Sequence, residues 1–248
     1  MRWSVKNILI WLMAIIVVGY LIGMGIWSSQ RANMRRCPSL EITITDLDER
    51  QYVTVEELAL MLQGKGLYPV NKTIATISTQ DIESAIQAHP MVRRSECYMT
   101  QAGSVCVRLC QRIPIVRIVS GDDSYFVDVD RTRMPINQSV TTPVLLVEGN
   151  VGERMACNEI VDLALWLYDN PYWQEKVQSI YVVNPKMVYL IQKPDGTHLI
   201  LGEVSGFKRK LNKLRTLYDK GFEQIGWQTY HEIDLRYSGQ VVGRKESN

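Results

Sequence analysis

Residues 78–111 have the sequence STQDIESAIQAHPMVRRSECYMTQAGSVCVRLCQ, and this stretch decides the fold of the first folded segment. Ser78 is an N-cap residue, and the helix that it opens ends at His89-Pro90, because proline disfavours helical geometry in the residue before it. Val92–Met99 and Val105–Leu109 are predicted strands, the second from its alternation of apolar and polar side chains. The glycine-containing turn between them predicts a β-hairpin.

A strand and another helix precede this stretch. Leu40–Ile44 alternates apolar and polar residues, which predicts a half-buried strand. Thr54 and Glu57 have the spacing of a capping box, and glycines end the helix that this box opens. The order strand, helix, helix, strand, strand predicts one compact α+β unit, because neither the helices nor the strands can bury their apolar faces alone.

From Ile115 onward strands dominate, and two helical segments interrupt them. Helices are predicted at residues 158–168 and 207–218, the second from the spacing of its apolar residues. A hairpin turn is predicted at Pro194-Asp195-Gly196. We therefore expect an α+β chain whose second part is a β-rich domain of antiparallel strands with flanking helices. Its strands are expected at residues 125–129, 144–147, 177–183, 188–192, 199–201 and 232–236, followed by a kink near Ser238-Gly239 and an extended Val241-Val242.

An uncharged run, Ile8–Trp27, lies near the start of the chain and has the sequence ILIWLMAIIVVGYLIGMGIW. A helix of this length spans about 30 Å, the thickness of a bilayer core, and satisfies its own backbone hydrogen bonds. A cleaved signal peptide would have a shorter apolar core that ends in small residues, so an uncleaved membrane anchor is predicted. Charge alone leaves its orientation open, because basic residues lie on both sides: Arg2 and Lys6 before it, and Arg31, Arg35 and Arg36 after it.

Composition and motifs exclude several classes of function. Lys and Arg number 28 and Asp and Glu 26, so the basic excess of a nucleic-acid-binding protein is missing. The histidines lie far apart in the sequence, and no zinc, nucleotide or hydrolase motif occurs, so we predict no catalytic residue, metal or cofactor. One carboxylate cluster is interpreted as turn residues, with a membrane-tethered hydrolase as the alternative: Asp122, Asp123, Asp128 and Asp130.

The five cysteines allow two interpretations. Cys97 and Cys106 flank the predicted hairpin turn at nearly equal distance, and they would form a disulfide in an oxidising compartment if they face each other. Small buried thiols on a sheet are the alternative. The odd number of cysteines excludes a fully paired set within one chain.

Motifs in both halves of the chain resemble one protein family. His89–Arg94 is similar to a Pro-Trp-Val pattern that follows the second helix, with Met91 in place of Trp. Tyr125–Asp130 with Met134-Pro135 resembles a valine-aspartate, glycine, hydrophobic-proline step, in which Arg131 or Thr132 stands where glycine is more common.

Two further motifs lie near the C-terminal end. Asp195-Gly196 with Leu199–Gly202 is similar to an Asp-Gly, Leu-Gly hairpin, and Ile233–Tyr237 resembles an Ile-Asp-Leu-Arg-Tyr signature. In this order, after a single anchor, the motifs resemble the bacterial cell-division family FtsQ/DivIB over nearly the whole chain. The divergent motif positions resemble its Bacteroidetes-type branch.

The resemblance implies a non-enzymatic, single-pass type II protein of the bacterial inner membrane, with its folded domains in the periplasm and enriched at the division septum. It implies a scaffold that links early and late division proteins, with no nucleic acid and no small-molecule substrate. The implied parts are a cytoplasmic tail at 1–7, a transmembrane helix at 8–27, a linker at 28–36, a POTRA domain at 37–112, a β domain at 113–243 and a C-terminal tail at 244–248.

The implied partners are FtsB-like and FtsL-like membrane coiled-coil proteins, beside other divisome proteins. A segment of the FtsB-like partner is expected to add as a strand to the edge of the last strand, where backbone hydrogen bonds supply the affinity. Asp234 and Arg236 are interpreted as a structural pair. A POTRA-containing envelope assembly or secretion component is the alternative function. The expected contact residues are Tyr237, Ser238, Gly239, Gln240, Val241 and Val242.

Overall fold

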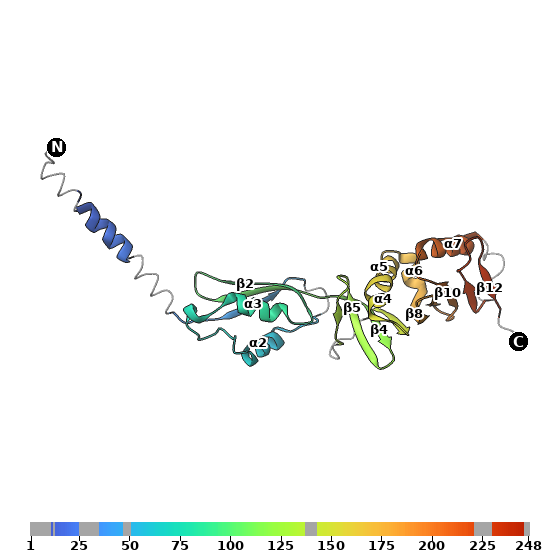
Figure 1. Ribbon diagram of the computed structural model, residues 1–248, viewed down its shortest axis with the longest axis horizontal. Coiled ribbons are helices and arrows are strands. Elements are labelled where there is room, and N and C mark those ends of the chain that lie inside the picture. The colour runs from blue at the N-terminus through green and yellow to red at the C-terminus, as the bar shows by residue number, and fades with distance from the viewer. Residues whose placement is uncertain are drawn as a thin grey trace. The chain divides into compact units, whose positions relative to one another are not determined.

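The computed structural model describes residues 11, 13–24, 35–46, 51–136, 143–220 and 230–245. Two compact units share the chain, residues 1–111 and 112–248. Figure 1 shows the order of their elements along the chain.

The described part of the predicted anchor is helical at residues 13–24, and its large apolar side chains are exposed. The remaining residues of the predicted span, 8–10, 12 and 25–27, lie outside the described part of the chain, as do the tail at 1–7 and most of the linker. Among the described residues, no helix has both the length and the apolar character needed to cross a membrane.

The first unit has the predicted order of strands and helices. Its three-stranded sheet has the order β1-β3-β2, with β1 parallel and β2 antiparallel to the central β3. A short 3₁₀ turn, Ile74–Thr76, joins the two helices. The elements are β1 (Leu40–Ile44), α2 (Val55–Gly64), α3 (Thr79–Gln87), β2 (Val92–Met99) and β3 (Val105–Gln111).

Local side-chain chemistry starts both helices as the sequence predicts. The Thr54 hydroxyl accepts the Glu57 N–H at 3.1 Å, and the Ser78 hydroxyl accepts the Asp81 N–H at 3.2 Å. Each bond satisfies a backbone donor that the first turn of a helix leaves without a partner. Met91, which stands where the family pattern has Trp, is buried in the core of this unit.

The register of the β2–β3 hairpin decides between the two cysteine interpretations. Cys97 pairs with Val107, and Tyr98 pairs with Cys106. Because neighbouring residues of a strand face opposite sides of a sheet, the two thiols lie on opposite faces, and both are free. Burial, with smaller effects of Glu83 and Cys106, raises the pKa of the Cys97 thiol to about 11, so this thiol stays protonated and unreactive at neutral pH.

The second unit is a nine-stranded mixed sheet with helices packed on it. The strand order is β12-β11-β10-β9-β8-β7-β4-β5-β6. The strands are β4 (Pro114–Ser120), β5 (Asp123–Asp128), β6 (Arg133–Met134), β7 (Leu145–Gly149), β8 (Val177–Asn184), β9 (Met187–Gln192), β10 (His198–Gly202), β11 (Glu232–Asp234) and β12 (Val242–Arg244).

The expectation of purely antiparallel strands is wrong. β7 is parallel to both β4 and β8, and β10 is parallel to β11. A helical crossover joins β7 to β8 and another joins β10 to β11, and a strand that returns after a crossover helix runs parallel to the one before it. The crossover helices are α4 (Glu153–Met155), a π turn (Ala156–Ile160), α5 (Val161–Tyr168), α6 (Pro171–Lys176) and α7 (Phe207–Lys220).

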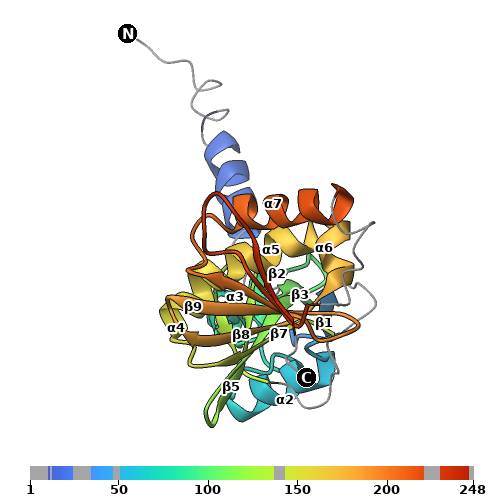
Figure 2. The same ribbon diagram turned by 90° about the vertical axis from the view of Figure 1, so that its right-hand side faces the viewer.

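Helices α5, α6 and α7 cover one face of this sheet, as Figures 1 and 2 show. Trp173 of α6 is fully buried there, together with Leu163 of α5 and Leu211 of α7. The sequence prediction missed α6, although Pro171 stands at its first turn, where proline is favoured. The opposite face of the sheet is partly exposed, with Tyr181 of β8 about half accessible.

The turn between β5 and β6 explains why the family pattern has glycine there. Arg131 has a φ of 64°, a left-handed conformation that costs a residue with a side chain about 1–2 kcal/mol. Its guanidinium donates to the carbonyls of Cys157 and Asn158 in the π turn, at 3.3 and 3.2 Å, and pairs with Asp162 at 2.7 Å. These contacts offset the backbone cost.

Two substitutions separate these effects. Arg131→Ala loses the side-chain contacts and keeps the left-handed backbone, so it is expected to lower the free energy of unfolding by about 1 kcal/mol. Arg131→Gly loses the same contacts but relieves the backbone, so it is expected to be more stable than Arg131→Ala by about 1 kcal/mol. Urea unfolding of the full-length chain measures both, and a glycine variant less stable than the alanine variant would contradict this account.

Candidate partner-binding edge

β12 ends the nine-stranded sheet and pairs on one side with β11 in antiparallel register, Ile233 opposite Gly243. Within the described residues, no strand pairs with its other side. Strand residues point their backbone groups alternately to the two sides, so part of the β12 backbone faces outward. Such a row of N–H and C=O groups is the feature that strand addition uses.

The structure places the six predicted contact residues differently from the prediction. The chain leaves β11 at Asp234, turns back, and enters β12 at Val242, so a hairpin replaces the kinked terminal strand. Residues 237–240 lie exposed in the hairpin loop, Val241 packs partly against the core, and only Val242 belongs to the edge strand. Tyr237 and Val242 have exposed side chains.

Two residues of the edge strand were missing from the predicted site. Gly243 and Arg244 complete β12, although residue 244 was assigned to the C-terminal tail. A Cβ at position 243 would lie only 2.6 Å from the nearest ring atom of Tyr230, so the tyrosine ring occupies the space that a side chain there would need. Arg244 pairs with Glu232 across the two strands at 2.8 Å. The adjacent β-branched residues Val241 and Val242 were the available signal for a strand here.

An ion pair between the buried Asp234 and the exposed Arg236 lies where the chain leaves β11. The carboxylate of Asp234, 3% exposed, accepts Nη2 of Arg236 at 2.6 Å and Nε at 3.0 Å, and it also accepts the Arg236 backbone N–H at 3.0 Å. Burial raises the pKa of Asp234, but the hydrogen bonds and charge of Arg236 outweigh this, and the pKa lies below its ordinary value. This geometry supports the interpretation of the two residues as a structural pair.

The last residue of β10, Gly202, leaves room for the side chain of Arg236 because it has no side chain of its own. Gly202 has a φ of 71°, and a Cβ there would lie 2.8 Å from the aliphatic stem of Arg236. The backbone also shifts register between Ile200 and Gly202, opposite β9. The glycine of the Leu-Gly motif and the arginine of the Ile-Asp-Leu-Arg motif are therefore in contact, Gly202 against Arg236.

Lys213 of α7 contacts the hairpin loop from the helix side of the sheet. Its ammonium donates to the carbonyl of Tyr237 and to that of Gln240, the latter at 2.8 Å. Burial and then Arg209 lower the pKa of Lys213, while Asp234 raises it. Figure 2 shows the dark-red hairpin reaching from the sheet to α7.

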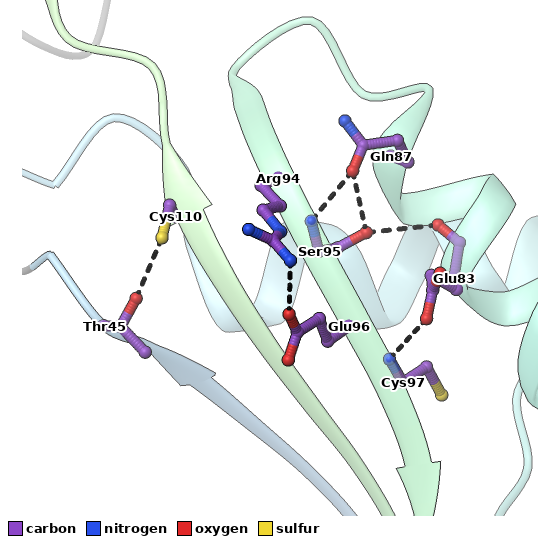
Figure 3. A network of polar contacts seen from close by, with 8 residues as sticks. All are labelled: Thr45, Glu83, Gln87, Arg94, Ser95, Glu96, Cys97 and Cys110. Carbon is purple, nitrogen blue, oxygen red and sulfur yellow. Dashed lines mark hydrogen bonds and ion pairs between the residues drawn. The ribbon is translucent and has the colours of Figure 1, made fainter.

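The edge of the first unit at β2 is built differently. Figure 3 shows Glu83 and Gln87 of α3 pointing at the strand. Glu83 accepts the Cys97 N–H at 2.7 Å, and Gln87 accepts the Ser95 N–H at 2.8 Å while donating to the Arg93 carbonyl at 2.9 Å. Three outward backbone groups of β2 are thus already bonded to α3, which hinders the addition of a further strand along this stretch.

The carboxylate cluster after β4 has a structural explanation. Asp128 is buried, pairs with Arg112 at 2.6 Å and accepts the Thr132 N–H at 2.8 Å, which closes the β5–β6 turn. Asp123 pairs with Arg133 at 2.8 Å. Among the described residues, no group of three or more His, Cys, Asp or Glu side chains has the arrangement of a metal site. Asp123 and Asp128 are therefore engaged in turn and ion-pair contacts.

Comparison with known families agrees with this architecture. A family model described as FtsQ/DivIB, C-terminal related, matches residues 113–244, which is more than half of the chain. The chain belongs to the FtsQ/DivIB family. A POTRA-like domain model matches residues 35–110, the unit in front of it. No curated protein matches the sequence. Proteins of the FtsQ/DivIB family act in cell division and are generally not enzymes.

The ion pair gives this FtsQ/DivIB chain a pH-dependent stability. Since the folded pKa of Asp234 is below its unfolded value of about 3.9, the pair stabilises the fold above that pH and loses this contribution as the pH falls towards the folded pKa. Asp234→Asn is expected to lower the free energy of unfolding by about 1.5–3 kcal/mol at pH 7, and the difference from wild type should shrink below about pH 4.

Asp219→Asn is the matched control, because Asp219 forms an exposed pair with Arg215 at 3.7 Å. Its effect should stay within about 0.5 kcal/mol. Urea unfolding at several pH values measures both variants. A difference between wild type and Asp234→Asn that does not change with pH would contradict the assignment.

Proposed function

We propose that this chain is a non-enzymatic scaffold of the division machinery, which links early and late division proteins at the septum. Its partners are FtsB-like and FtsL-like membrane coiled-coil proteins, and a segment of the FtsB-like protein adds as a strand along β12. The observation that carries the proposal is the β11–β12 hairpin, an exposed edge strand held in place by buried and half-buried charges.

The contrast between two sheet edges supports this site. At β2, side chains of α3 bond one outward backbone group of each of three residues. At β12, the outer side is paired with no strand in the described part of the chain. Natural proteins cover or break exposed edges because they promote aggregation, so an edge left open indicates use.

The membrane anchor is part of the same proposal. The uncharged run Ile8–Trp27 has the length of a bilayer span, and the described helix at 13–24 exposes only uncharged side chains, most of them apolar. We place the POTRA-like unit and the β domain outside the cytoplasm, as the family implies. The coiled-coil partner is itself a membrane protein. Anchoring both proteins in the same membrane raises the effective concentration of each at the surface of the other.

Site-specific photo-crosslinking tests which surface meets the partner. Tyr237 and Tyr181 are exposed tyrosines of nearly equal accessibility, 49% and 47%, but Tyr237 lies in the hairpin loop and Tyr181 lies on β8 in mid-sheet. A photoreactive phenylalanine at 237 in the full-length protein is expected to capture small membrane coiled-coil proteins in cells, and the same group at 181 is not. Capture at 181 alone would overturn the proposed site, and capture at neither position would overturn the proposed function.

The mode of binding is tested at Val242. The Arg244 carbonyl accepts the His231 N–H and so faces β11, and the backbone of Val242, two residues away, faces β11 as well. Val242→Pro therefore breaks the pairing of β12 with β11 and the edge that depends on it, whereas Val242→Ala keeps the backbone and removes most of the side chain. If backbone bonds supply most of the affinity, Val242→Pro loses the coiled-coil pair in co-purification and Val242→Ala retains it. Thermal unfolding of both variants checks that the domain stays folded. Equal loss in both variants would favour side-chain recognition over strand addition.

A further inference from the structure

Lys213 occupies an unusual place beside the proposed edge. It lies on α7 between Leu211 and Leu214, which are both fully buried, so the backbone of the helix is fixed to the core at this point. Its side chain reaches across to the hairpin loop and donates to the carbonyls of Tyr237 and Gln240. One ammonium thus joins two points of the loop that are three residues apart.

The loop has little else to order it. In the described part of the chain, no backbone hydrogen bond outside the strands involves residues 237–241, and the side chains at 237–240 are exposed. Val241 packs partly against the core at one end, and the Asp234–Arg236 pair fixes the other end. The stretch between these two points depends on Lys213.

We propose that Lys213 is a positioning residue for partner binding: it holds the Tyr237–Gln240 loop, and with it the start of β12, in the conformation that accepts the partner strand. This inference rests on the proposed function. The Lys213 ammonium is bonded to the two loop carbonyls, so Lys213 influences the partner through the loop and not by direct contact. Apparent affinity falls in proportion to the fraction of molecules in the competent conformation, so loosening the loop weakens binding.

The same helix supplies a matched control. Lys210 is also half-buried and donates to two backbone carbonyls, those of Leu201 at 2.9 Å and Glu203 at 2.6 Å, at the end of β10. Methionine has a similar length and helix propensity but no charge or donor. Lys213→Met and Lys210→Met therefore remove the same chemistry from two different loops.

The experiment uses the full-length protein in detergent and has two readouts. Chymotrypsin cleavage after Tyr237 measures the order of the loop in the free protein. Titration with the purified coiled-coil pair that the wild-type protein captures measures affinity. Lys213→Met is expected to speed cleavage and to weaken binding about tenfold, the effect of a tenfold fall in the ordered fraction. Lys210→Met is expected to change neither, and Lys213→Arg, which keeps charge and donors, should restore much of both.

The outcomes separate the inference from the function on which it rests. Cleavage that does not change in Lys213→Met overturns the inference, as does faster cleavage with unchanged affinity. Weaker binding in Lys210→Met to the same extent also overturns it, because the effect would then be general to α7. If the wild-type protein captures no coiled-coil pair, the proposed function fails and the positioning role falls with it, while the cleavage result still reports whether Lys213 orders the loop.

Discussion

The C-terminal edge of the sheet depends on one buried charge. Asp234 is almost inaccessible to water, and its carboxylate would be costly there without the fork of donors from Arg236. The pair requires a glycine at position 202, because the stem of Arg236 occupies the space that any side chain would fill. It sets the direction in which the chain leaves β11, and that direction allows the hairpin to form. The position of the exposed strand β12 therefore depends on an ion pair in which the carboxylate is buried and the guanidinium is exposed.

Local patterns in the sequence predicted most of the elements. Thr54 and Ser78 cap the helices as expected, and the apolar alternation of Val105, Val107 and Leu109 gives a buried central strand. These features are decided within a few residues, so the sequence contains all the information they need. The α+β class follows from the same patterns, and so does the interpretation of Asp128 as a turn residue, since its carboxylate accepts a backbone donor four residues away.

The errors concern long-range pairing. β10 and β11 are parallel because the chain crosses over through α7 between them. The sequence predicted this helix, but the prediction did not include the parallel direction of β11 that follows from it. The hairpin around the predicted contact residues was missed for a similar reason, and whether those residues bind the partner stays a prediction. Ser238-Gly239 predicted a kink but not a full reversal, and the reversal is held by the Asp234–Arg236 pair and by the carbonyl contacts of Lys213, 24 residues away from Tyr237. The two cysteines of the first hairpin were equally undetermined, because a shift of one residue in register decides which face each thiol occupies.

The closure of β2 by Glu83 and Gln87 has a consequence for the number of molecules that can join. A protein with two receptive edges is bivalent, and a bivalent unit whose contacts do not close into a ring can grow into an open-ended fibre. With outward groups of β2 already bonded to α3, the proposed strand addition leaves β12 as the one receptive edge of these two strands. If the partner strand adds to β12 as proposed, β2 of the same chain offers no equivalent edge, so strand addition along these two strands stops at one partner and does not extend to a next copy.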